Sequence, residues 1–309
     1  MLLVVPNPNP GQTNVNIITQ SGITINEILD KIDRNMEKKV DLLHLKVIIF
    51  ERSVAEKGLS QSIESFMRAR DISDKTFAAI SDGPLEPLFD KLQSASESSG
   101  TETYDYFEKN AGWSPEVVQT RIWEVFRSMN SFTRDDVIPI VKPGLSTTIE
   151  SAGSAVIRNG KMVGVIDSEE SLLYNLFKGA GTQGKIEVMD HATVKIVADR
   201  LNRSSAMQKG RAIMKGKLRL KVTVLETVGS PTEAQIKSEI DEQLSAHFEA
   251  MLEAAQAKEA DILGLGQYFR DKLSRDDLRQ WRTKYYPFMK FEFKVHVIIQ
   301  DEGLLKTNN

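Results

Sequence analysis

The sequence contains no cysteine in its 309 residues. The chain therefore cannot form a disulfide, present a thiolate nucleophile, bind zinc through cysteine or hold an iron–sulfur cluster. No segment approaches the run of ~20 apolar residues that spans a bilayer, and the apolar stretch 1–6 lacks the basic residues and the length of a signal peptide. These absences exclude many enzyme classes and predict a chain that is soluble as written.

A strong net charge is also lacking. The formal net charge is −3 at pH 7, with 27% charged and 40% hydrophobic residues, which is ordinary for a globular protein. This balance gives no general attraction to nucleic acid, so we expect no nucleic-acid partner and only local electrostatic functions. A chain of this length exceeds one typical core and predicts two or three domains.

The first predicted unit, residues 1–93, mixes helices and strands. Thr24 and Glu27 form a capping-box pattern, in which a hydroxyl and a carboxylate satisfy free amides at a helix start. The apolar, β-branched run 43–50 predicts a buried strand. The expected elements are a helix at 24–36, a strand at 43–50, a helix from Ser53 to Gly58, a helix through 63–67, a strand at 76–80 and a helix at 84–89.

The second predicted unit, residues 94–182, begins at the polar stretch 94–103, which has the composition of a linker. Asn159 and Gly160 lie between two apolar runs, the strongest short-range signal for a β-hairpin. Asp167 is the expected cap of the helix that follows. The expected elements are a helix from Ser114-Pro115 to Met129, a hairpin at 155–166 and a helix ending near Gly179.

The third predicted unit, residues 183–309, combines strands with one long helix. Strands are expected at 193–198, 217–228 and 291–299 from their alternating apolar residues. Apolar residues recur every three or four positions over a helix at 231–260, which a Ser230–Glu233 capping box should start. The predicted fold class is therefore α+β, with three small mixed domains in series, the last an antiparallel-rich sheet packed on a long amphipathic helix.

Three patterns in the sequence are candidates for a catalytic, phosphate-binding or metal-binding site. The stretch Gly179–Lys185 has the glycine spacing of a phosphate-binding loop, but it follows a predicted helix and precedes a strand, the reverse of what such loops need, so a linker is favoured. The four histidines share no metal-ligand spacing. Asp190 and His191 would be half of an acid–base pair without a nucleophile. We therefore predict no catalytic residue, no cofactor, no metal and no enzyme activity.

A basic run without acidic residues extends from Lys209 to Lys221. One interpretation is contact with anionic lipid headgroups, each charge contributing about 1 kcal/mol near such a surface. The other, which the sequence favours, is the solvated face of an edge strand whose lysines prevent edge-to-edge pairing. The candidate membrane-surface residues are Lys215, Lys217, Arg219 and Lys221.

Aromatic side chains are concentrated near the C-terminus. Trp281, Tyr285, Tyr286 and Phe288 lie within eight positions. Such residues anchor interfaces and also fill the cores of small domains. We expect a role in the core.

Five residues follow the long predicted helix: Asp261, Gly264, Gly266, Trp281 and Tyr285. With the closing amphipathic strand, their order resembles the C-terminal signature of the Ger(x)C family, the C-subunit lipoproteins of nutrient germinant receptors. Leu263 and Leu265 stand where that family usually has aromatic residues, so apolarity is kept and ring area is lost. The resemblance marks the five residues as a family signature and as candidate interaction residues.

Two further regions agree with this resemblance in the same order. Residues 155–164 look like the hairpin of the family, and residues 22–25 and 43–49 resemble its N-terminal helix and strand. Family members start with a signal peptide and a lipid-modified cysteine, which this sequence does not show, so we expect the chain to start inside the first domain.

The resemblance implies a function without bond chemistry. It predicts a receptor subunit required for spore germination that works with integral-membrane subunits of the same receptor. The family's upstream lipid anchor would hold it on the outer face of the spore inner membrane. A competing hypothesis is an extracytoplasmic module that binds the nutrient itself, for which a concave pocket with convergent polar groups is needed.

Overall fold

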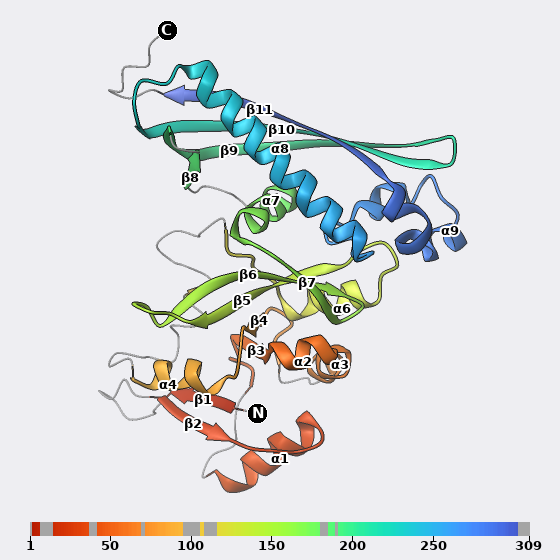
Figure 1. Ribbon diagram of the computed structural model, residues 1–309. Coiled ribbons are helices and arrows are strands. Elements are labelled where there is room, and N and C mark those ends of the chain that lie inside the picture. Colours follow the sequence, from red (N-terminus) through yellow and green to blue (C-terminus); the bar gives the residue numbers. More distant parts are fainter. Residues whose placement is uncertain are drawn as a thin grey trace.

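The computed structural model describes residues 2–6, 15–36, 42–68, 72–94, 106–107, 116–179, 185–188 and 191–301. Figure 1 shows the elements stacked roughly in chain order, from a small N-terminal β-pair and helix to a long C-terminal sheet at the other end. Helices and strands are mixed throughout, and the sheets are mixed or antiparallel. The predicted α+β class is confirmed.

The N-terminal elements form a small layer of their own. Strands β1 (Leu2–Pro6) and β2 (Val15–Thr19) pair antiparallel, and helix α1 (Ile25–Asn35) follows. The Thr24 hydroxyl accepts a hydrogen bond from the Glu27 amide at 3.2 Å, which confirms the predicted cap. Ile28 and Ile32 are the buried residues of this helix.

A five-stranded sheet forms the middle of the molecule. Its order is β3 (Val47–Glu51), β4 (Phe77–Ser81), β5 (Asp136–Pro143), β6 (Ile149–Arg158) and β7 (Lys161–Ile166). The first three strands run parallel and the last three antiparallel. All five residues of β4 are buried, as expected for a strand covered on both faces.

Helices cover the two faces of this sheet. Ala78 and Ile80 pack in a core with residues of α2 (Arg52–Lys57), α3 (Ser60–Arg68) and α6 (Ile122–Met129). Phe77 and Ala79 point the other way, into a core with α4 (Glu86–Ser94). Since side chains alternate along a strand, the two cores lie on opposite faces.

This sheet includes strands from both sides of the boundary predicted between residues 93 and 94. Strand β4 pairs directly with β5, so any division there would cut through a continuous sheet. The three-domain division 1–93, 94–182 and 183–309 stays a prediction, and the first two units share one set of strands. Residues 95–103 of the predicted linker lie outside the described residues.

The predicted hairpin has the expected turn. Asn159 and Gly160 have positive φ angles of 49° and 75°, which Asn and Gly adopt most easily, and β6 and β7 pair around them. The Asp167 carboxylate accepts a hydrogen bond from the Glu170 amide at 2.8 Å and caps α7 (Ser168–Lys178). Both predictions are confirmed.

The C-terminal sheet has the order β11 (Lys290–Asp301), β10 (Arg211–Thr227), β9 (Ala192–Gln208) and β8 (Lys185–Val188). Its pairs are antiparallel except β10 with β11, which is parallel. Helix α8 (Glu233–Ala257) lies across one face, as Figure 1 shows. The predicted packing of an antiparallel-rich sheet on a long amphipathic helix is confirmed.

Several boundaries differ from the prediction. Strand β3 begins at Val47 rather than at residue 43, and α6 begins at Ile122 rather than near 114, because the Thr120 carbonyl accepts a hydrogen bond from the Ala78 amide and holds the preceding segment extended. The cap of α8 is Thr232 with Gln235, not Ser230 with Glu233. Strand β9 includes residues 199–208 and strand β10 includes residues 211–216, which the sequence did not predict as strands.

Candidate functional site around Asp261

The signature residues lie where the chain leaves α8. Gly264 has a positive φ of 65°, and a 3-10 turn (Leu265–Phe269) follows. The Asp261 carboxylate accepts hydrogen bonds from the amides of Leu265 and Gly266, both at 2.8 Å. The indole Nε1 of Trp281 donates a third bond to Asp261, also at 2.8 Å. One buried carboxylate thus holds the turn and the later helical segment together.

Gly266 has no room for a side chain. A Cβ at this position would lie 2.6 Å from Trp281 Nε1 and 2.7 Å from Thr133 Cβ. Trp281 is fully buried and contacts the ring of Phe269 at a centroid distance of 5.0 Å. The glycine therefore allows the indole to reach Asp261, and the two are parts of one arrangement.

A second buried carboxylate, Asp135, adjoins the first. Arg282 donates to Asp135 through Nε and one terminal nitrogen, each at 2.8 Å, and the same terminal nitrogen also donates to the carbonyls of Ser131 and Arg134. The Asp261 amide donates to Asp135 at 2.9 Å. We call Asp135, Asp261, Trp281 and Arg282 the latch, because these residues join the segment before β5 to the segment after α8.

Burial changes the acidity of both carboxyls. Removal from water raises the pKa of Asp261 from 3.8 to about 6, although its three N–H donors favour the ionised form. Burial also raises the pKa of Asp135, and the Arg282 guanidinium opposes that shift. The latch therefore contains two buried carboxyl groups whose ionised forms are stabilised by the N–H groups that donate hydrogen bonds to them.

The remaining signature residue lies at the border of this cluster. Tyr285 is partly buried, its ring stacks near Trp281 at 6.3 Å, and its hydroxyl donates to Asp277 at 2.6 Å. Tyr286 is fully buried and donates to the Ala260 carbonyl. The expected core role is thus confirmed for Trp281 and Tyr286, and it is wrong for Phe288, which is 66% exposed.

The structure brings the signature residues together but hides most of them from any partner. The side chains of Asp261 and Trp281 have no exposed surface. Their oxygens and nitrogen already have partners within the chain. The arrangement can fix one backbone conformation and one relative placement of two segments; it offers no free acid or base to a reactant.

The basic residues of β10 lie on an interior strand, not on an edge. Strand β10 pairs with β9 on one side and β11 on the other. Lys215, Lys217, Arg219 and Lys221 are all exposed and alternate with buried residues that face α8. The edge-protection interpretation is therefore wrong, because the backbone of β10 has no free edge to protect.

The described residues of the other candidate patterns do not gather into a site. The centre of the glycine-rich stretch, residues 180–184, and Asp190 lie outside the described residues. His191 Nδ1 lies 3.0 Å from Glu239, and His247 Nδ1 lies 3.0 Å from Glu169. Within the part of the chain that the structure describes, no three His, Asp or Glu side chains gather as metal ligands.

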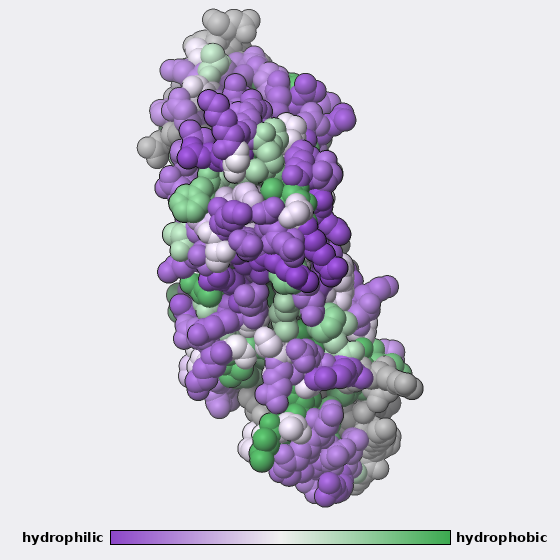
Figure 2. All heavy atoms as spheres, turned by 90° about the vertical axis from the view of Figure 1, so that its right-hand side faces the viewer, coloured by the Kyte–Doolittle hydropathy of each residue, from purple (hydrophilic) through white to green (hydrophobic). Residues whose placement is uncertain are grey.

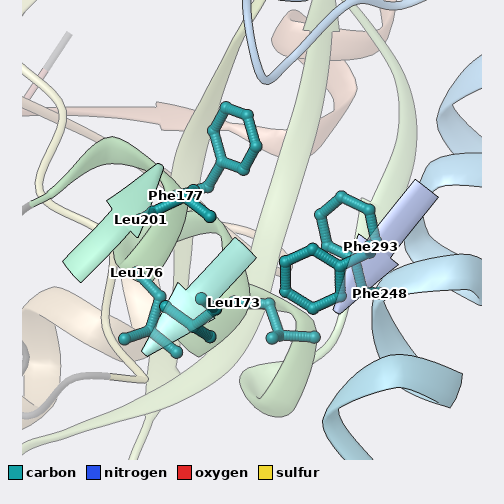
Figure 3. A pocket seen from close by; sticks show the side chains of 7 residues that line it. Leu173, Leu176, Phe177, Leu201, Phe248 and Phe293 are labelled. Carbon is teal, nitrogen blue, oxygen red and sulfur yellow. The ribbon is translucent and has the colours of Figure 1, made fainter. Parts of the chain in front are cut away.

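An apolar hollow lies between α7, α8 and the C-terminal sheet. Figure 3 shows its lining, and all of it is apolar: Leu173, Leu176, Phe177, Leu201, Leu218, Phe248 and Phe293. Phe248 and Phe293 stack at 4.1 Å, and the hollow has no space for a water molecule. It is packed core and lacks the convergent polar groups of a ligand pocket.

Comparison with known proteins identifies the family. Two family models match the chain in succession: the spore germination protein N-terminal domain over residues 2–143, and the spore germination B3/GerAC like C-terminal domain over residues 152–303. The chain belongs to the Ger(x)C family of spore germination proteins. The first match ends with β5 and the second begins inside β6, so both include part of the five-stranded sheet.

Members of the Ger(x)C family resemble this chain over nearly its whole length. Spore germination protein GerQC from Bacillus cereus is 20% identical over 95% of this chain and 84% of its own. The crystal structure of the GerBC protein matches with a TM-score of 0.63 and 14% identity, covering 96% of this chain and 97% of that one. The structural likeness supports the same fold, and the family gives this chain a role in spore germination.

The sequence did not predict two of the latch residues. Asp135 and Arg282 are 147 positions apart, and neither follows a recognisable motif. The signal that was available is indirect: a charged residue next to Trp281 in a segment otherwise predicted to be core.

No described helix has the length and apolar character needed to cross a membrane.

Proposed function

We propose that this Ger(x)C chain is a non-enzymatic subunit of a nutrient germinant receptor. It would act by protein–protein contact with the integral-membrane subunits of the same receptor. Its place would be the outer face of the spore inner membrane, held there by a lipid anchor as in the family it belongs to. The relatives' names support germination as the process.

The observation that carries the non-enzymatic part is the state of the buried acids. Asp135 and Asp261 are the two carboxyls that contact the signature residues Trp281 and Gly266 or their neighbour Arg282, and each oxygen of both already accepts at least one hydrogen bond from within the chain. Such groups hold structure. A general acid or base must instead lie within reach of a bound reactant.

The outer surface supports a role in contact with other molecules. Figure 2 shows one face of the molecule, on which hydrophilic residues predominate and hydrophobic ones occur in small groups. Exposed large apolar side chains include Phe132, Leu145 and Phe288. A non-obligate interface is about as apolar as the rest of a protein surface, so a surface of this composition is compatible with a subunit that folds before it assembles.

Co-purification tests the proposal. The chain, expressed with a lipid anchor and an affinity tag in a spore-forming host, should bring down the two membrane subunits of its receptor from detergent-solubilised spore membranes. A strain lacking the chain should fail to germinate on the nutrient of that receptor, and the tagged chain should restore germination. A stable chain that never brings down either subunit, in a strain whose germination does not depend on it, would contradict the proposal.

A groove favours a second candidate, the binding of a small nutrient molecule. Its volume is about 170 Å³, and it lies between the turn of the β9–β10 hairpin and the segment before β11. It is lined by Lys209, Gly210, Arg211, Ala212, Lys284, Tyr285 and Phe288. Three basic side chains and two rings suit a small carboxylate-bearing ligand.

Calorimetric titration of the chain with a panel of amino acids and sugars tests this second candidate. A ligand should bind to the wild-type chain and lose affinity at least about tenfold in Arg211→Ala. The matched control is Arg275→Ala, an exposed arginine in the first turn of α9 (Arg275–Arg279), which should bind as the wild type does. No heat with any compound of the panel would set this candidate aside.

A further inference from the structure

The outer face of the C-terminal sheet is rich in charged side chains. Helix α8 covers the inner face, and the inward residues of β9, β10 and β11 pack in the core with it. The outward residues alternate with these and are exposed on all three strands. A face of this kind is open to a partner over its whole width.

The charges on this face are almost all positive. The outward positions from the row of Ile213 to the row of Lys221 hold seven basic side chains and one acidic side chain, Glu292. We call the seven the basic face: Arg200, Lys215, Lys217, Arg219, Lys221, Lys290 and Lys294. Only Lys215 has an ion pair with another described residue, at 3.0 Å from Glu292.

Like charges stand directly opposite each other across the strands. Arg219 is the register partner of Arg200 on β9, and Lys217 is the partner of Lys294 on β11. Facing like charges destabilise a sheet, and of these four residues Arg200, Lys217 and Arg219 lie on interior strands, while Lys294 lies on the edge strand β11. Because β9 and β10 are interior strands, edge protection does not explain the facing pair of Arg200 and Arg219.

Spacing makes these charges act together. Outward residues repeat roughly every 7 Å along a strand, and neighbouring strands lie about 5 Å apart. Both distances are below the Debye length of about 8 Å at physiological salt, so the potentials of the basic face add. An extended anionic surface would meet several of these charges at once.

The composition of the face distinguishes lipid from protein and from nucleic acid. Five of the seven basic residues are lysines, which act as point charges without the paired geometry of arginine. Protein interfaces are depleted in lysine and enriched in aromatic rings, and single-stranded nucleic acids stack on such rings. No outward position between the rows of Ile213 and Lys221 carries a phenylalanine, tyrosine or tryptophan.

We infer that the basic face docks against an anionic phospholipid surface. Each lysine or arginine near such a surface contributes favourably, and seven of them act over one flat area. The exposed Ile298, the register partner of Lys221, adds an apolar contact at the border of the face. The inference concerns a surface and does not depend on the receptor role proposed above.

Vesicle sedimentation with the full chain, without a lipid anchor, tests this inference. The chain should sediment with phosphatidylcholine vesicles that contain phosphatidylglycerol and not with phosphatidylcholine alone, and rising salt should release it. The charge reversal Lys217→Glu with Arg219→Glu should lower the apparent affinity about tenfold or more. Lys161→Glu with Arg275→Glu removes the same net charge at exposed positions outside this sheet and should bind as the wild type does.

A second variant distinguishes the loss of positive charge from unfolding of the charge-reversed variant. Lys217→Gln with Arg219→Gln removes the two charges without introducing like or opposite ones; its circular dichroism should match that of the wild type, and its melting temperature should be no lower. It should still lose several-fold in vesicle affinity. Equal binding of the wild-type chain to both kinds of vesicle, or no binding at low salt, would overturn the inference. It would also be overturned, in favour of an acidic protein partner, if the charge-reversed variant lost receptor co-purification while its vesicle binding stayed unchanged.

Discussion

The guanidinium of Arg282 donates two hydrogen bonds of 2.8 Å to the carboxylate of Asp135, although the two residues are 147 positions apart in the sequence. Asp135 is fully buried and precedes the central strand β5, while Arg282 lies in the segment that leads to the last strand. The pair joins the middle sheet to the C-terminal unit. Since the two ions compensate each other in the interior, the loss of either leaves a buried charge.

We expect Arg282→Ala to lower the free energy of unfolding by ~3–5 kcal/mol, because Asp135 would remain buried without its counter-ion. Arg282→Lys should cost less, since a lysine restores the charge but not the two-pronged contact. Urea denaturation followed by circular dichroism measures both. Arg275→Ala is the control and should change the free energy by no more than ~0.5 kcal/mol. Equal free energies of unfolding for the Arg282 and Arg275 variants would contradict a stabilising role of the Arg282–Asp135 pair.

Gly266→Ala should destabilise the chain by ~1–3 kcal/mol, because the new methyl group would collide with the indole of Trp281 and with Thr133. The matched control is Gly83→Ala, where an added Cβ meets no heavy atom within 4 Å. Thermal unfolding of the two variants separates the steric effect from a general effect of removing a glycine. A melting temperature of Gly266→Ala at or above that of Gly83→Ala would contradict the predicted clash.

The Asp261 carboxyl should titrate near pH 6, because burial raises its pKa from 3.8 to about 6. Between these two pH values the folded chain binds more protons at this site than the unfolded chain does. The contribution of Asp261 to the free energy of unfolding therefore falls as the pH rises from about 4 to about 6, and it is largest below that window. The carboxyl carbon shift of labelled Asp261, followed by NMR, measures the midpoint, and a midpoint below pH 4 would show that the three N–H donors dominate instead.

Arg219→Gln should slightly increase stability at low salt, by ~0.2–1 kcal/mol, because it removes the facing charge of Arg200. The gain should shrink as salt is added, since exposed charges are screened. Denaturation at two salt concentrations, with Arg275→Gln beside it, measures the difference. A loss of stability at both concentrations would mean that Arg219 contributes packing that the cross-strand register does not reveal.

The sequence was sufficient for elements with strong local signals. The α8 periodicity, the Asn159-Gly160 turn and the Asp167 cap each depend on residues within one or two turns of chain, and each is confirmed. The long strands β9 and β10 were shortened in the prediction because several inward positions of the missed part are not apolar: Asp199, Arg203, Ser205 and Gly216. There the apolar signal weakens, and the Lys209-Gly210 turn with positive φ at both residues was not recognised.

The latch shows where local reasoning ends. The resemblance to the Ger(x)C signature placed Asp261, Gly266 and Trp281 in one group, and the structure brings them into contact. The sequence contained nothing that pairs Arg282 with Asp135, because a single ion pair leaves no periodic trace in either segment. The same limit applies to β10, whose interior position follows from the late return of β11 and not from its own residues.

The connection between β5 and β6 lies between the two halves of the chain, since the first family match ends with β5 and the second begins at residue 152, inside β6. The hydrogen-bond register from Asp136 with Ile157 to Pro143 with Ile149 runs directly across that connection. A cut at 144–148 would leave each fragment with a long bare strand, and bare strands recruit copies of one another. Expressed alone, either half is expected to precipitate, whereas the two produced in one cell should reassemble through this shared seam.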